Sequence, residues 1–409
     1  MKIVQINTTY GVSDSTGRTS QEMHRWLREH KISSIVYCVT VNDGSHDKGV
    51  YYFSGQRQQK IHGLLSRVTG LQGYFSFLPT VKLIKCLYLE KPSVVILRVL
   101  HSNCLNFPLL FRFLSKNKIA TVMMTHDCWY MTGHCMSPAF FQCEKWQTVC
   151  KKCPAIHMYN PSWFFDTSKK CFLDKKKWFS SLSNLAVVGV SDWATELVKM
   201  SMLQNAKIIR RIYNWIDIDI FKPVENKALR HSYQYSDTKP LLLGVASKWS
   251  EAKGLQVIIK VAKEMPDVQI ILIGFCKKDN TMPENIKLIG EVSDIRKLAD
   301  YYAMADIFLN PSLYETFGKT TAEAISCGTP VVAYRTTACL ELVGDKHGVA
   351  VEIGNEEKFI LAIKEILKKG KQGFSLDCRR FAEKEFSKEA NIKKYLELID
   401  ELVEQNDNK

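Results

Sequence analysis

The sequence predicts an α/β protein with two doubly wound parallel sheets, one in each half of the chain. Apolar runs of strand length alternate with stretches of helical periodicity through both halves. Runs such as Pro92–Leu100 and Val268–Phe275 are mostly apolar, which is typical of strands buried on both faces. The length of 409 residues, with 46% hydrophobic and 24% charged residues, suits two ordinary domains.

The first half begins as a strand, a glycine-bearing loop and a helix. Lys2–Asn7 runs apolar, Gly11–Gly17 is polar, and Arg18–His30 has apolar residues at helical spacing. Further strands are expected at Ser33–Val41, Val94–Val99, Ala120–Thr125, Leu185–Val190 and Ile208–Ile212, with helices at Leu109–Lys116 and Ser191–Leu203. This order predicts a Rossmann-like sheet covered by helices on both faces.

The second half repeats the pattern after a polar joint at Lys222–Lys239. Strands are expected at Pro240–Ala246, Val268–Gly274, Ile286–Ile289, Ile307–Asn310, Pro330–Ala333 and Val349–Ile353, with helices at Leu255–Glu264, Ile295–Ala303 and Thr320–Cys327. We expect one domain over 1–215, with a Cys-rich insertion at 128–154, and a second over 216–385. A C-terminal helix over 386–409 has an apolar face and is expected to pack back toward the first domain.

Two open parallel sheets of this kind are expected to face a central cleft, with ligand-binding loops at the carboxyl ends of their strands. No apolar run approaches the roughly 18 residues that a membrane span needs, and the N-terminal residues read as a strand and not as a signal peptide. We therefore expect a cytoplasmic protein.

Positive charge is concentrated in the first half. The net charge is +14, and residues 1–200 hold 25 Lys and Arg against 12 Asp and Glu, whereas residues 201–409 hold 31 against 30. A basic surface suits nucleic acid, anionic lipid or a phosphorylated substrate, and solvated lysines that serve only solubility are a competing interpretation.

Five cysteines and a histidine lie within 26 residues of the first half. Thirteen cysteines in a chain of this size do not indicate a disulfide framework in a reducing compartment. The Cys-x-x-Cys spacing lets two thiolates bind one tetrahedral metal ion. We predict a structural zinc held by Cys135, Cys143, Cys150 and Cys153. Free thiols in a folded loop, or a redox pair, are the alternatives.

The most specific segment runs from Asn310 to Pro330. A strand ends at Asn310, the loop carries Glu315, Gly318 permits a tight turn, and a helix begins near Lys319. A helix N-terminus beside a glycine offers backbone N–H groups that suit a diphosphate. Carboxylates accept hydrogen bonds from sugar hydroxyls, so Glu315 and Glu323 on either side of such a site fit a nucleotide sugar.

This segment resembles the donor signature of family 4 glycosyltransferases, which have the two-domain GT-B fold. The resemblance rests on Glu315 and Glu323 with seven residues between them, on Phe317-Gly318 within that interval and on Gly328-Thr329-Pro330 after it. It implies a retaining hexosyltransferase that needs no cofactor for catalysis and no metal ion at the donor. It also implies that the donor contacts the following residues: Glu315, Thr316, Phe317, Gly318, Lys319, Thr320 and Glu323.

Other positions match the same family. Lys253-Gly254 corresponds to its pyrophosphate-binding Lys-Gly pair, and Lys248 stands where the family usually has an arginine. His126, at the end of a strand, matches a histidine that contacts the donor sugar, and Gly17 lies where related enzymes have a glycine-rich turn near the donor phosphates. The resemblance thus implies that His126, Glu315 and Lys253 are the catalytic residues.

The Cys-rich stretch resembles a subgroup of family 4 enzymes from bacterial capsule and exopolysaccharide pathways, of colanic-acid type. This implies a UDP- or GDP-sugar donor and a surface-glycan acceptor that is linked to polyprenyl diphosphate. The N-terminal domain would then be the acceptor side. Two segments, Lys60–Lys85 and Trp163–Phe179, mix basic and large apolar residues and suit peripheral binding to the inner membrane surface. The alternative is that their apolar faces pack on the sheet.

Two other functions compete with this interpretation. A nucleotide-sugar epimerase on the same fold would need acid and base groups around the sugar and no acceptor site. A basic zinc-containing nucleic-acid-binding protein is suggested by charge and cysteines, but the basic half has no recognisable recognition helix or finger spacing. We therefore expect no nucleic-acid partner.

Overall fold

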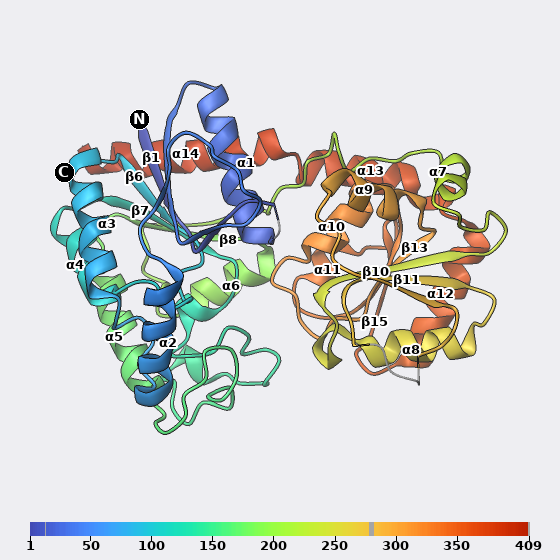
Figure 1. Ribbon diagram of the computed structural model, residues 1–409, viewed down its shortest axis with the longest axis horizontal. Helices are drawn as coiled ribbons and strands as arrows, with labels where there is room; N and C mark the ends of the chain where they lie inside the picture. The colour runs from blue at the N-terminus through green and yellow to red at the C-terminus, as the bar shows by residue number, and fades with distance from the viewer. Residues whose placement is uncertain (13, 278–281, 408–409) are drawn as a thin grey trace. The chain divides into compact units, whose positions relative to one another are not determined.

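The computed structural model describes residues 1–12, 14–277 and 282–407. The chain forms two compact units (Figure 1). The first comprises Met1–Ile212 together with Ile392–Lys409, and the second comprises Tyr213–Asn391. The boundary thus lies at 212/213, three residues before the position expected from the sequence.

The first unit is built on a seven-stranded parallel sheet with the order β5-β3-β1-β6-β7-β8-β9. Its strands are β1 (Lys2–Ile6), β3 (Ser33–Cys38), β5 (Val50–Tyr52), β6 (Val94–Leu97), β7 (Ala120–Thr125), β8 (Leu185–Gly189) and β9 (Ile208–Arg211). A small pair, β2 (Thr9–Tyr10) and β4 (Thr40–Val41), follows β1 and β3. The central strands β6 and β7 are buried along their whole length, because helices cover both faces of the sheet.

The helices of the first unit are α1 (Ser15–Glu29), α2 (Gln56–Thr69), α3 (Phe77–Glu90), α4 (Phe107–Lys116), α5 (Ser168–Ser180) and α6 (Asp192–Met200). Helix α1 begins three residues earlier than the pattern suggested. Asp14 caps it by accepting hydrogen bonds from the backbone N–H groups of Thr16 and Gly17. The segment 15–17, expected to be loop, is therefore the first turn of a helix.

The second unit contains a six-stranded parallel sheet with the order β12-β11-β10-β13-β14-β15. Its strands are β10 (Leu241–Lys248), β11 (Gln269–Phe275), β12 (Ile286–Ile289), β13 (Ile307–Asn310), β14 (Val331–Tyr334) and β15 (Gly348–Val351). The helices are α7 (Asn226–Ser232), α8 (Leu255–Glu264), α9 (Ile295–Met304), α10 (Lys319–Ser326), α11 (Cys339–Leu342), α12 (Glu356–Lys369) and α13 (Gln372–Glu385). Two doubly wound parallel sheets were predicted, and this prediction is confirmed.

The last helix, α14 (Lys388–Asp407), begins in the second unit and continues in the first. Its apolar residues Ile392, Tyr395, Leu398, Ile399 and Leu402 are fully buried. Arg210 at the end of β9 donates to Glu401 at 2.6 Å. The sequence placed the start of this helix at 386, and residues 408 and 409 lie outside the described residues. Among the described helices, none combines the length and apolar character that crossing a bilayer requires.

Candidate functional site

The predicted donor residues of the second unit come together at one edge of its sheet. Strands β10 and β13 are parallel neighbours, with Leu242 opposite Ile307. The loops that follow them, 249–254 and 311–318, therefore leave the sheet side by side at its carboxyl end. This is the edge at which open α/β sheets bind ligands.

Gly254 allows the two loops to come into direct contact. Its φ of 69° is left-handed, and a Cβ added there would lie 2.3 Å from the carbonyl oxygen of Pro311. The backbone N–H of Leu313 donates to the carbonyl of Ala252 at 2.9 Å. A side chain at 254 would hold the loops apart, and this accounts for the glycine that follows Lys253.

The two charged residues expected to act on the donor are already paired. Lys253 Nζ lies 2.6 Å from Glu315 Oε1, and both side chains are partly buried. Burial acts to lower the pKa of Lys253, but the neighbouring Glu315 carboxylate outweighs it, so the pKa of Lys253 lies above its usual value. Lys253 is therefore a permanent cation at neutral pH.

Glu315 is also held through its backbone. Its N–H donates to Thr337 Oγ1 at 2.8 Å, and the Thr337 hydroxyl donates to the Glu315 carbonyl at 2.7 Å. These two bonds join the 311–318 loop to the loop after β14. These contacts hold the backbone of Glu315 in place. Its carboxylate is therefore available for the contact with Lys253.

Helix α10 begins directly after this loop. Gly318 is its N-cap, with a φ of 84°, and no side chain caps the helix. The N–H groups of its first turn, from Lys319 and Thr320 onward, therefore form a positive helix end. Thr316, Lys319 and Thr320 are partly exposed here, as a donor contact requires.

Glu323 lies one turn into α10 and is only 1% exposed. Its Oε2 accepts a hydrogen bond from the Tyr302 hydroxyl of α9 at 2.9 Å. A buried carboxylate without such partners would be costly, so Tyr302 stabilises Glu323 in this position. Glu323 thus belongs to the helix that Gly318 caps, and its side chain is buried instead of exposed at the helix end.

Two other predicted donor residues are placed differently from each other. Phe317 is 3% exposed, and its ring packs against Tyr213 and Phe386, with ring centroids 5.7 Å away in each case. Its side chain is therefore part of the core, which corrects the expectation that it faces the donor; only its backbone remains for that role. Lys248, at the end of β10, is exposed at the same sheet edge.

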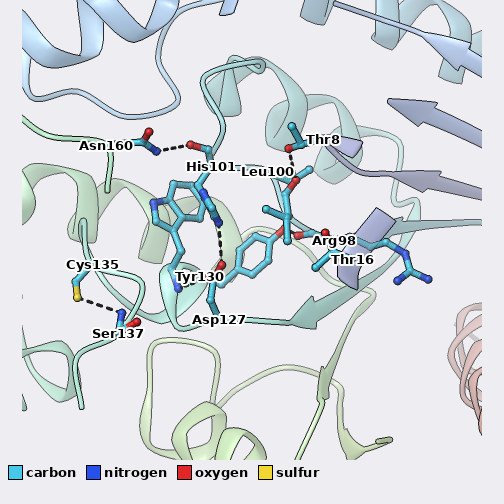
Figure 2. Close-up of polar contacts among 12 residues, drawn as sticks. Thr8, Thr16, Arg98, Leu100, His101, Asp127, Tyr130, Cys135, Ser137 and Asn160 are labelled. Atoms are coloured by element: carbon cyan, nitrogen blue, oxygen red, sulfur yellow. Dashed lines mark hydrogen bonds and ion pairs between the residues drawn. The ribbon is translucent and has the colours of Figure 1, made fainter. Parts of the chain in front are cut away.

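In the first unit, His126 follows β7 at the carboxyl end of the sheet and is partly exposed. Next to it, Asp127 Oδ2 lies 2.8 Å from Nε2 of His101, which comes from the loop after β6 (Figure 2). Burial acts to raise the pKa of Asp127, but the His101 ring and the Trp129 N–H outweigh it and lower that pKa. Asn160 Nδ2 donates to the His101 carbonyl and holds this loop (Figure 2).

Gly17 has a structural reason to be glycine. A Cβ at this position would lie 2.9 Å from both the carbonyl oxygen of Gly11 and a carboxylate oxygen of Asp14. The first turn of α1 thus packs directly against the loop that precedes it. Gly17 was expected in a loop like the glycine-rich turn of related enzymes, and the structure corrects this by placing it, buried, inside the helix.

Several residues of these two sheet edges did not emerge from the sequence. They are His101, Asn160, Tyr302 and Thr337. His101 follows a strand and could have been found by asking which polar residues end each strand. Asn160, Tyr302 and Thr337 act on residues 13 or more positions away in the chain, and no local pattern signals such contacts.

The four cysteines of the predicted zinc site line one cavity of about 20 Å³, which has room for a single small ion. Cys135 Sγ accepts a hydrogen bond from the N–H of Ser137 at 3.2 Å, and Cys150 Sγ from that of Gly133 at 3.3 Å. Within the described residues, however, no group of three or more His, Cys, Asp or Glu side chains is preassembled to hold a metal ion. The zinc site therefore stays a prediction.

Comparison with known proteins identifies the second unit. Residues 239–369, which include both donor loops, match the family model described as Glycosyl transferases group 1. The match to this family thus covers most of the second unit. This agrees with the resemblance to family 4 enzymes seen in the loop after β13.

Curated relatives match longer stretches of the chain than the family model does. The colanic acid biosynthesis glycosyl transferase WcaC of Escherichia coli is 27% identical over 267 residues, 64% of each chain. The D-inositol 3-phosphate glycosyltransferase of Mycobacteroides abscessus is 26% identical over 203 residues, 46% of this chain and 45% of that protein. The matches thus span less than two thirds of these relatives' length.

Solved structures resemble the whole chain. Sucrose-phosphate synthase from Thermosynechococcus elongatus has a TM-score of 0.73 at 14% identity and 99% coverage of both chains. The Anabaena protein HepE in complex with UDP-glucose has a TM-score of 0.68 at 15% identity, covering 98% of this chain and all of that one. These similarities show that the chain has the two-domain GT-B fold.

Proposed function

We propose that the protein is a retaining glycosyltransferase that moves a hexose from a nucleotide diphosphate sugar to a surface-polysaccharide acceptor. The observation that carries this proposal is the arrangement of Lys253, Glu315 and the uncapped start of α10 at one sheet edge. A cation and a helix N-terminus attract a diphosphate, and an adjacent carboxylate accepts hydrogen bonds from a sugar. Few ligands other than a nucleotide sugar need a diphosphate-binding helix end and an adjacent carboxylate together.

The chemistry proposed for this site is electrostatic and needs no metal ion. The bond between the sugar C1 and the β-phosphate oxygen breaks while the acceptor hydroxyl attacks from the same face. The hydroxyl proton passes to the departing phosphate oxygen. Lys253 and the α10 N–H groups stabilise the charge that develops on the leaving diphosphate. Glu315 positions the hexose. By resemblance alone, the buried Glu323 is assigned to the ribose and His126 of the first unit to the sugar.

The donor class is supported by proteins of similar fold or sequence. HepE binds UDP-glucose, and a relative from Mycobacterium tuberculosis, 33% identical over 98 residues, is named for its dependence on GDP-mannose. We accordingly propose a UDP- or GDP-sugar donor. The name of WcaC supports a glycan acceptor in polysaccharide biosynthesis, which we propose to be linked to polyprenyl diphosphate. Such an acceptor places the enzyme in the cytoplasm, at the inner face of the membrane.

A ligand screen tests the donor assignment. Purified protein is heated with UDP-, GDP-, ADP- and dTDP-sugars, and the unfolding temperature is compared with that of the free protein. One nucleotide sugar should raise it, because a ligand that binds only the folded state stabilises that state. Glu323→Gln and Lys253→Met should remove the effect, whereas Lys346→Met, at an exposed lysine of the same unit, should keep it.

Product analysis of the same samples separates the alternatives. Transfer to a glycan acceptor, with the anomeric configuration of the donor kept, supports the proposal. An epimerised nucleotide sugar formed without acceptor would make the protein an epimerase. Failure of every nucleotide sugar to shift the unfolding temperature would refute the donor site itself.

We also propose that Cys135, Cys143, Cys150 and Cys153 bind a structural zinc ion. It is supported by their common cavity and by the N–H groups that already point at two of the sulfurs. Over residues 128–167, all of them described, regular structure is limited to the short turns η1 (Trp129–Met131) and η2 (Lys145–Gln147). A metal ion would order such a segment.

Elemental analysis of protein purified without a metal-binding tag tests this. We expect about one zinc per chain, lost in Cys150→Ser with Cys153→Ser and kept in Cys276→Ser, which alters a cysteine of the second unit. A wild-type zinc content equal to that of the double variant would leave the cluster as free thiols or a redox pair.

A further inference from the structure

Helix α3 of the first unit is apolar on two faces. Thr80, Leu83 and Leu87 face inward and are buried. The opposite face is also apolar: Leu78 is 71% exposed and Leu89 is 68% exposed, and Phe77, Val81 and Tyr88 are exposed beside them. A helix that only covers a sheet carries polar residues on its outer face, so this face is unusual.

Helix α2 and the loop at 163–165 show the same feature. Ile61, Leu64, Leu65 and Val68 recur at helical spacing on the exposed side of α2. Trp163, Phe164 and Phe165 are exposed in succession, and Phe164 reaches 70%. Three separate segments thus present large apolar side chains to solvent.

Hydrogen bonds join these segments into one surface. His62 of α2 bonds to Ser76, directly before α3, at 2.7 Å. At the other end of α2, the N–H of Trp163 donates to the Arg67 carbonyl at 2.7 Å, and Thr167 Oγ1 donates to the Gly70 carbonyl. We call the exposed side chains of α2, α3 and 163–165 the docking face.

The docking face is strongly cationic. Residues 56–91 contain six Lys and Arg and one acidic residue, Glu90, which is already paired with Lys2 at 2.9 Å. The segment 107–118, which includes α4, adds three more cations and no acidic residue. A negatively charged partner would therefore meet attraction along the whole face.

Between α3 and α4 this face is hollowed into an open groove of about 480 Å³. Its floor is apolar and includes Val81, Ile84 and Phe113. Lys85, Arg112 and Lys116 line the same groove. Apolar floor and cationic lining together match a molecule that carries an acyl or prenyl chain and a phosphate.

We propose that the docking face binds an anionic phospholipid bilayer. The apolar side chains of α2, α3 and 163–165 enter the interface, and the α3–α4 groove receives a lipid phosphate with part of its chain. Exposed aromatic and aliphatic side chains among cations are the pattern of shallow membrane insertion. The inference deepens the proposed function, because a lipid-linked acceptor lies in such a membrane, and it rests on that function only for its biological purpose.

Part of the Trp163–Phe179 segment does not belong to this face. Lys175 is 1% exposed and donates to the carbonyls of Trp129 and Thr132 at 2.8 and 3.0 Å. Lys175 lies within the segment Trp163–Phe179, whose basic residues were expected from the sequence to suit membrane binding. It instead anchors the Cys-rich segment, and the docking face keeps only the aromatic start of this region.

Sedimentation of the full-length protein with vesicles tests the proposal. The vesicles are phosphatidylcholine alone, or phosphatidylcholine and phosphatidylglycerol in equal parts, with no donor or acceptor present. We expect binding only to the anionic vesicles, weakened by salt. Lys85→Glu with Arg112→Glu should reduce the affinity at least about tenfold, and Leu78→Ser with Phe164→Ser should reduce it by about the same factor.

Matched variants of the second unit serve as controls. Lys346→Glu with Arg380→Glu changes the charge equally, and Leu361→Ser with Leu376→Ser removes exposed leucines. Both should bind vesicles within about twofold of the wild type. Unfolding temperatures of all variants verify that each is folded.

Three results would overturn the proposal: no sedimentation of the wild type, equal binding by docking-face and control variants, or self-association that the docking-face variants abolish without vesicle binding. The last would identify a second copy of the chain as the partner. Stabilisation by a nucleotide sugar should persist in the docking-face variants, so a failure here and a failure of the donor assignment remain distinguishable.

Discussion

The two units share an architecture and differ in what they expose. Of the 25 large apolar side chains that are exposed among the described residues, 19 belong to the first unit. The second unit instead concentrates polar chemistry at the carboxyl edge of its sheet, where Lys253 and Glu315 pair. The comparison teaches that one doubly wound design can present charged groups at its strand ends or large apolar side chains on its outer helices.

Substitution of Gly254 should have the largest effect and should fall on the second unit alone. Gly254→Ala forces a Cβ to within 2.3 Å of the Pro311 carbonyl and places alanine at a φ of 69°. We expect a loss of about 3 kcal/mol of stability and no stabilisation by the donor. Chemical unfolding with and without the nucleotide sugar measures both.

Gly290→Ala provides the control for that substitution. Nothing lies within 4 Å of a Cβ at 290 and its φ is not left-handed. Its stability and donor response should match the wild type. If both alanine variants behaved alike, the contact between the two donor loops would have no part in binding.

Removal of the paired cation should have the next largest effect. Lys253→Met deletes the charge while keeping the length of the side chain, and should lower the initial rate of transfer by about 10²-fold. Because Glu315 raises the pKa of Lys253, the difference from the wild type should stay constant between about pH 6 and about pH 9. A rate difference that varied through this range would assign the leaving-group charge to another residue.

Acidification should destabilise the first unit more than the second, and we expect this effect to be smaller than the two preceding ones. In the first unit, burial lowers the pKa of His62 to about 4 and also lowers the pKa values of His24 and His134. In the second unit, burial lowers the pKa of His347. The unfolded chain takes up these protons near pH 6.5, whereas the folded chain takes them up only at lower pH, near pH 4 for His62. The stability of the first unit should therefore decrease as the pH is lowered from about 6.5 to about 4, by about 1 kcal/mol per pH unit for His62.

Urea unfolding at pH 7 and at pH 5 measures this difference. His62→Gln, which cannot take up a proton, should lose less stability on acidification than the wild type does. His46→Gln, at an exposed position, should behave as the wild type. Equal acid sensitivity in all three proteins would locate the effect elsewhere.

Most of the fold could be predicted from the sequence because buried parallel strands are continuously apolar and helices are periodic. Ala120–Thr125, Ile286–Ile289 and Leu255–Glu264 were placed to the residue. The start of α1 was missed because the polar residues 15–17 look like loop until Asp14 is seen to cap them. Local pattern therefore predicts the elements better than their ends.

The positions of the two candidate donor loops at strand ends could be predicted because the residues of each loop are close in sequence and follow a strand. The environment of each side chain could not. Phe317 and Lys175 have the types of a ligand contact and of a surface residue, but long-range packing buries both. The Lys253–Glu315 pair spans 62 residues of chain, and only the sheet order shows that the loops carrying these two residues are adjacent.

The buried face of α14 has a consequence for how the protein is made. The first unit is interrupted at residue 212 and regains its last segment, with Tyr395 and Leu402, only after the whole second unit has been translated. A nascent chain can complete the second unit while the first still lacks one of its helices. During synthesis the first unit is then the later one to mature, and loss of α14 from Ile392 onward would destabilise that unit.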